Sequence, residues 1–135
     1  MAGGHAPVDL PWLLFLAVPA LYWLTAAAPT GPAAFWIGWG AGFGYFVASL
    51  HWIVHPFLVR GEGQDTLIWL AWLSGGLSGL FAMAAGLALF WGLAFWAARR
   101  IWPGAGPAGV LCLAAMWSAV EYARANVLTG FPWAL

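Results

Sequence analysis

The 135-residue sequence contains no lysine, a single cysteine and very few charged residues of either sign. Only 6% of its residues are charged, with four arginines balancing four acidic residues, whereas soluble domains carry about 25% charged residues. No basic patch exists to neutralise phosphates, so we expect no nucleic-acid partner. Cys112 has no second cysteine to pair with, so no internal disulfide is possible and redox compartment cannot be argued from it.

The sequence also lacks recognisable groups of catalytic or metal-binding residues. Cys112 lies in the apolar run VLCLAAM, without a nearby His, Lys or acid, and is interpreted as a buried small residue. His51 and His55 are four residues apart and share a helix face, a spacing that can bind a metal. Further ligands are not evident, which favours a pair of interfacial imidazoles. We therefore expect no catalytic residue, no metal and no cofactor in this chain.

Hydrophobic residues are abundant, at 64% of the chain, and there are twelve tryptophans. Tryptophan is enriched at membrane–water interfaces. The composition predicts an all-α membrane protein with about four transmembrane helices in one antiparallel up-down bundle. The apolar runs that would span the membrane are residues 10–28, 33–55, 66–98 and 110–128. A run of about 19 residues reaches about 28 Å, close to the roughly 30 Å hydrocarbon core.

Two features of the middle spans leave alternatives open. The 66–98 run is longer than one untilted span needs. It is a tilted helix, a helix whose first turns lie in the membrane interface with Trp69 and Trp72 as anchors, or a helix broken at Gly75–Gly76. In the 33–55 run, glycines at 38 and 42 and at 40 and 44 form two pairs of the small-xxx-small type. Such pairs favour close helix packing, and a groove for a lipid chain is the alternative.

Charge placement predicts the topology. Arg99 and Arg100 follow the third span and place its end in the cytoplasm. Trp91, Phe95 and Trp96 near that end are predicted to lie at the membrane–water boundary. The N-terminus has no basic residue of the kind that a signal peptide carries, so the first apolar run is interpreted as a retained helix.

The last span carries the most informative charges. Glu121 and Arg124 are three residues apart, so they share a helix face near the end of an apolar segment. Charges in such positions usually face protein or a water-filled cavity. We expect the two side chains to interact or to share a polar pocket. The following TGFPW motif, residues 129–133, is predicted to end the helix.

These residues carry a resemblance to a known family. The E-x-x-R pair with V-L-T-G-F-P-W at residues 121–133 resembles a segment of bacterial apolipoprotein N-acyltransferases. GWGAGFGYFVASLHWI at 38–53 and APVDLPW at 6–12 are similar to two further blocks of that family, in the same order. The resemblance covers nearly the whole chain, but only an early membrane part of the family's architecture.

The resemblance implies a function. The family transfers an acyl chain from a phospholipid to the N-terminal diacylglyceryl cysteine of lipoproteins, at the bacterial inner membrane. A Glu–Lys–Cys set in a nitrilase-like periplasmic domain forms the thioester intermediate, and none of the three can be assigned here. The resemblance thus implies that residues 1–135 are one transmembrane domain, a fragment of a larger enzyme and inactive alone. The candidate lipid-binding residues are Glu121, Arg124, Phe131 and Trp133.

A small stand-alone membrane protein, such as a transporter half or an assembly subunit, is the alternative. Transport paths need polar residues midway along helices. The mid-span polar residues here are small, such as Ser49 and Ser74, and the charges lie near helix ends. This pattern counts against a transporter, whereas a purely structural oligomer remains compatible with the glycine pairs.

Overall fold

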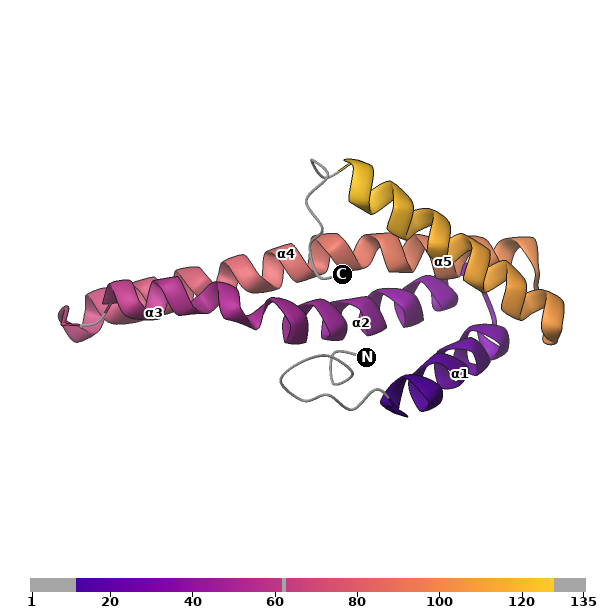
Figure 1. Ribbon diagram of the computed structural model, residues 1–135, viewed down its shortest axis with the longest axis horizontal. Coiled ribbons are helices and arrows are strands. Elements are labelled where there is room, and N and C mark those ends of the chain that lie inside the picture. Colours follow the sequence, from indigo (N-terminus) through magenta and orange to yellow (C-terminus); the bar gives the residue numbers. More distant parts are fainter. Residues whose placement is uncertain (1–11, 62, 128–135) are drawn as a thin grey trace.

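The computed structural model describes residues 12–61 and 63–127, and within these ranges it contains helices and no strand (Figure 1). The predicted all-α fold is therefore confirmed. Two helical segments, Gly31–Arg60 and Thr66–Ile101, are long and apolar enough to cross a membrane. The elements are α1 (Trp12–Ala27), α2 (Gly31–Leu50), a 3₁₀ turn (His51–Val54), α3 (His55–Gly61), α4 (Thr66–Ile101) and α5 (Pro107–Val127).

Proline, glycine and threonine determine where the helices begin. The Thr30 side chain accepts a hydrogen bond from the backbone N–H of Ala33, at 3.3 Å, and so caps α2. Pro32 lies in the first turn of α2, where a missing N–H has no cost. At the other connection, Gly106 has a φ of 120°, which favours glycine, and Pro107 begins α5. The α1–α2 and α4–α5 connections are therefore short links between antiparallel helices.

The core lies along the contact between α2 and α4. Every fourth residue of α2 faces α4 and is buried, as the helical period requires. At Gly42, a Cβ would lie 3.2 Å from Cα of Ala88, and at Gly38 it would lie 2.7 Å from the carbonyl oxygen of Trp91. Gly40 and Gly44 are exposed and meet nothing within 4 Å. One glycine pair therefore permits close packing, whereas the other leaves open surface. The buried α2 residues are Ala34, Gly38, Gly42, Phe46 and Leu50.

The second predicted span is interrupted, which the sequence analysis did not anticipate. After Leu50 the chain makes a 3₁₀ turn before α3 begins at His55. Pro56 supplies a physical reason, because proline has no N–H and its ring clashes with the carbonyl four residues earlier. That carbonyl, on Trp52, instead accepts a hydrogen bond from the N–H of His55. The result is a bend between α2 and α3.

The third predicted span is one continuous helix. α4 runs for 36 residues from Thr66 to Ile101 without a break at Gly75–Gly76. Gly75 faces open space, and Gly76 is buried against the ring of Phe57. A helix of this length is about 54 Å long. The structure therefore contradicts a break at Gly75–Gly76, whereas the tilt of this helix in a membrane stays a prediction.

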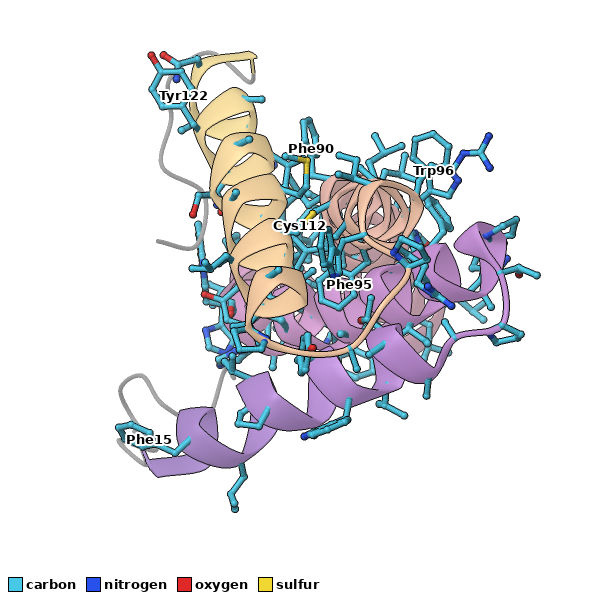
Figure 2. All side chains as sticks on the ribbon, turned by 90° about the vertical axis from the view of Figure 1, so that its right-hand side faces the viewer. Phe15, Phe90, Phe95, Trp96, Cys112 and Tyr122 are labelled. Atoms are coloured by element: carbon cyan, nitrogen blue, oxygen red, sulfur yellow. The ribbon has the colours of Figure 1, made fainter. Side chains whose placement is uncertain are left out.

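α5 packs against the C-terminal half of α4, and α1 lies beside the same end of the molecule (Figure 1). Figure 2 shows Phe95 and Cys112 between α4 and α5, whereas Phe15 and Tyr122 project away from the bundle. Trp91 and Phe95 are both buried, so their predicted position at the membrane–water boundary is wrong. Trp96 is partly exposed, and its position is compatible with that prediction.

Candidate functional site

Glu121 and Arg124 form an ion pair on α5. Nε of Arg124 donates to Oε2 of Glu121 at 3.2 Å, and Nη2 donates to the same oxygen. The i,i+3 spacing places the two side chains on one helix face, as the sequence predicted. The Arg124 side chain is only 3% exposed, whereas that of Glu121 is 30% exposed. The guanidinium therefore lies inside the protein and the carboxylate lies at its edge.

Trp91 on α4 completes the coordination of the carboxylate. Its indole N–H donates a hydrogen bond of 2.7 Å to Oε1 of Glu121. Both oxygens of Glu121 therefore accept hydrogen bonds, one from α4 and the other from α5. Hydrogen bonds to an ionised group are stronger than neutral ones. The three residues form a polar cluster within an otherwise apolar interface, which we call the Trp91–Glu121–Arg124 cluster.

α2 also contributes to this cluster. The Arg124 guanidinium carbon lies 5.5 Å from the centre of the Phe46 ring, a cation–π distance. The Trp91 ring stacks on Tyr45 at 5.3 Å and meets Trp117 edge-on at 4.6 Å. The cluster therefore joins α2, α4 and α5. An ion pair in this environment is costly to break, because losing one partner leaves the other charge buried.

Sequence reasoning found two of the three members of this cluster. Glu121 and Arg124 stand out as charges in an apolar run, but Trp91 is one of twelve tryptophans. Its hydrogen bond spans 30 residues of sequence, and no local pattern encodes it. Phe131 and Trp133, the other two candidate lipid-binding residues, lie outside the described residues.

A second polar cluster joins the two helix connections at the opposite end of α5. Nε of Arg99 donates to the carbonyl of Ala28 at 2.9 Å, and its Nη1 donates to the carbonyl of Pro103. The Tyr22 hydroxyl donates to the carbonyl of Gly106 at 2.9 Å and accepts from the N–H of the same residue at 2.7 Å. The sequence suggested Arg99 only as a topology signal. In the structure Arg99 also links the α1–α2 connection to the α4–α5 connection by hydrogen bonds.

The remaining candidate groups have simple environments. Sγ of Cys112 lies 3.7 Å from the carbonyl oxygen of Ala98, and the side chain is half-buried. The rings of His51 and His55 are 6.1 Å apart, and both residues are exposed. Within residues 12–61 and 63–127, no three His, Cys, Asp or Glu side chains gather as metal ligands do.

Comparison with known proteins identifies the family. Residues 1–135 match the domain family described as the apolipoprotein N-acyltransferase N-terminal domain. A curated apolipoprotein N-acyltransferase of Allorhizobium ampelinum is 37% identical over 136 residues, which cover 94% of this chain and 24% of the relative. The protein of that name from Rhodopseudomonas palustris is 40% identical over 126 residues, covering 90% of this chain and 22% of the relative.

A third relative, from Caulobacter vibrioides, is 44% identical over 103 residues, covering 76% of this chain and 18% of the relative. No solved structure matches the chain significantly. The chain spans about a quarter of the length of the first two relatives in this comparison, at 24% and 22%. Because the family match extends over all 135 residues and several relatives exceed 30% identity, the chain belongs to the apolipoprotein N-acyltransferase family.

Proposed function

We propose that this chain is the membrane-embedded part of an apolipoprotein N-acyltransferase. The whole enzyme would transfer an acyl chain from a phospholipid to the N-terminal diacylglyceryl cysteine of a lipoprotein. The observation that carries this proposal is the match to the family's N-terminal domain over residues 1–135. Two helical segments long enough to cross a membrane support the membrane setting.

Within that enzyme, the chain would act as a platform and not as the site of bond formation. Acyl transfer through a thioester needs a thiolate with a base and an oxyanion stabiliser beside it. Cys112 is half-buried, and its Sγ contacts the carbonyl oxygen of Ala98, which can stabilise neither a thiolate nor an oxyanion. Glu121 and Arg124 satisfy each other, with Trp91 as a third partner. These groups are therefore arranged to fix helices.

The platform's proposed lipid-side rim is the end of α5. The Trp91–Glu121–Arg124 cluster holds this end against α2 and α4. We assign Glu121, Arg124, Phe131 and Trp133 to the rim, where a phospholipid donor would approach. Glu121 is the more accessible of the two charged residues, at 30% exposure.

The proposed placement is a multi-pass arrangement in the bacterial inner membrane. The arginines at 99 and 100 favour a cytoplasmic α4–α5 connection by the positive-inside rule. Because the helices alternate in direction, the α3–α4 connection and the end of α5 then lie on the periplasmic side. This is the side on which the family's nitrilase-like catalytic domain would work.

A chimeric enzyme tests the proposal. This chain replaces the matching region of the Caulobacter vibrioides relative, and the purified chimera is placed in phospholipid vesicles with a diacylated lipopeptide. We expect mass spectrometry to show acylation of the lipopeptide amino group. The same chimera carrying Cys112→Ala should retain that activity, because Cys112 takes no part in bond formation. A chimera that inserts and folds but transfers no acyl chain, while the parent enzyme does, would refute the proposal.

A further inference from the structure

The helical hairpin formed by α2, α3 and α4 is longer than the hydrocarbon core of a bilayer. α2 has 20 residues and reaches about 30 Å, which already matches the hydrocarbon core. α4 has 36 residues and reaches about 54 Å. At a tilt of 40°, the upper end of the usual range, α4 still extends about 41 Å along the bilayer normal. At least about 11 Å of the hairpin therefore lies beyond the hydrocarbon core.

The excess length lies at the end where α3 meets the first turns of α4. Figure 1 shows that α1 and α5 flank only the other end of the hairpin, so α3 and the start of α4 extend past them. The 3₁₀ turn at His51–Val54 follows directly after the 20 residues of α2. We call α3 and residues 66–76 the hairpin tip.

The hairpin tip is apolar despite lying beyond the hydrocarbon core. Leu67 is 81% exposed and Val59 is 66% exposed, and Ile68 and Leu70 are also exposed. An open groove of about 730 Å³ lies between α3 and α4, a volume within the range of small-molecule sites. Phe57, whose ring packs against Gly76, contributes to its wall. The groove is lined by His55, Pro56, Phe57, Val59, Arg60 and Trp72.

Among the described residues that line the groove, one carries a permanent charge, and that charge is positive. The guanidinium carbon of Arg60 lies 5.5 Å from the centre of the Trp72 ring. The ion pair that the described residues form is on α5, and Arg60 is not part of it. Asp65, which precedes α4, is not among the groove-lining residues. Apolar walls with a cation at one edge match a ligand that has an apolar tail and an anionic head.

We propose that this groove binds one acyl chain of a phospholipid, with the lipid phosphate on Arg60. The groove thus holds an acyl chain partly withdrawn from the hydrocarbon core. This inference rests on the proposed function for its membrane setting and names the lipid class that the hairpin tip binds. Its tests measure labelling and binding, not acyl transfer. If the labelling and binding tests fail, the chimera can still be active. If the chimera is inactive, the labelling and binding tests can still succeed.

The first test concerns the position of the hairpin tip. In a Cys112→Ala background, Leu67→Cys and Leu89→Cys are placed on the same helix, at positions that are 81% and 48% exposed. A charged thiol reagent is present on both sides of phospholipid vesicles. We expect rapid labelling at position 67 and protection at position 89, which lies in the middle of the core. Protection at both positions would place the tip in the hydrocarbon and overturn the proposal.

The second test concerns the occupant. Phosphatidylglycerol brominated on its acyl chains is titrated into the protein in detergent micelles, and the fluorescence of Trp72 is taken as the difference between the wild type and Trp72→Phe. We expect saturable quenching of Trp72, and Arg60→Gln should raise the half-quenching concentration about tenfold or more. Arg100→Gln, the same substitution at an exposed position on the far end of α4, should leave quenching unchanged.

Three results of the second test would overturn the proposal. Absence of Trp72 quenching would show that no acyl chain enters the groove. Equal quenching by a brominated diacylglycerol, which lacks the phosphate, would show that Arg60 does not contribute to lipid binding. Displacement of the lipid by millimolar inorganic phosphate would show that the site takes a free anion and not a lipid.

Discussion

The indole N–H of Trp91 on α4 donates a 2.7 Å hydrogen bond to Oε1 of Glu121 on α5, across 30 residues of sequence. The opposite oxygen of the same carboxylate accepts from Arg124. Glu121 is therefore shared between a neighbour on its own helix and a neighbour on another helix. This arrangement makes the end of α5 dependent on α4, and it leads to the first two predictions.

Removing one partner of the Glu121–Arg124 ion pair should lower stability more than removing both partners. Arg124→Leu leaves the Glu121 carboxylate, which is 30% exposed, without its charged partner, and we expect this to cost about 1–3 kcal/mol of stability. The double variant Glu121→Leu/Arg124→Leu should be the more stable of the two. SDS unfolding in mixed micelles, followed by circular dichroism, measures the difference. Equal stability of the single and double variants would contradict a coupled pair.

Trp91→Phe keeps most of the aromatic packing but removes the indole donor. A hydrogen bond to a charged group contributes about 1.5–3 kcal/mol, so the unfolding free energy should fall by about that amount. Trp36→Phe makes the same change at a position that is exposed, and should shift stability by less than about 0.5 kcal/mol. If the two variants lose the same stability, the hydrogen bond to Glu121 does not contribute measurably to the free energy of unfolding.

The two glycine pairs of α2 should respond to alanine with opposite signs. At Gly38 an added Cβ would lie 2.7 Å from the backbone carbonyl of Trp91, so Gly38→Ala should destabilise the protein by about 1–3 kcal/mol. At Gly40 the Cβ would meet nothing within 4 Å. Gly40→Ala should therefore stabilise α2 by up to about 1 kcal/mol, the usual helix gain. A similar loss at both positions in the micelle unfolding assay would contradict the one-sided packing.

The adjacent arginines at 99 and 100 provide a matched pair. Arg99 donates to the carbonyls of Ala28 and Pro103, whereas Arg100 is exposed. Arg99→Gln should lower stability by about 1.5–3 kcal/mol and speed hydrogen exchange in both helix connections. Arg100→Gln removes the same charge and should change neither. Equal effects of the two variants would show that charge alone matters at this end of α4.

The chain on its own should leave a lipopeptide amino group free. Its single thiol, on Cys112, contacts the carbonyl oxygen of Ala98, an acceptor that cannot serve as the oxyanion stabiliser that acyl transfer needs. Purified protein in phospholipid vesicles with a diacylated lipopeptide is assayed by mass spectrometry. Acyl transfer above the vesicle-only level, lost in Cys112→Ala, would show that this thiol is a nucleophile after all.

Local sequence signals predicted the helices and the ion pair but not their partners. Long apolar runs and the prolines at 32 and 107 mark the helices, because these signals act within a few residues. The pairing of Glu121 with Arg124 is local in the same sense. Trp91 was misplaced at the membrane boundary because its burial depends on the approach of α2 and α5. Tertiary packing therefore decided what the local pattern left undetermined.

The bend after Leu50 and the continuity of α4 show the same distinction. Pro56 is a local signal, but its effect appears several residues earlier, as a 3₁₀ turn and not as the end of the helix. Gly75 and Gly76 are weak helix formers, yet the helix continues through them. Gly76 is held against Phe57 of α3, a contact that only the folded hairpin provides.

The hydrogen bonds between Tyr22 and Gly106 join residues that are 84 positions apart in the chain. A ribosome adds about 5–20 residues per second, so roughly 4–17 seconds separate the synthesis of the two partners. During that interval the Tyr22 hydroxyl cannot form these hydrogen bonds, because Gly106 has not yet been synthesised. The contact of Arg99 with Ala28 spans 71 positions and forms late for the same reason. In the order of synthesis, α1 thus meets α2 early but acquires its hydrogen bonds to the α4–α5 connection late.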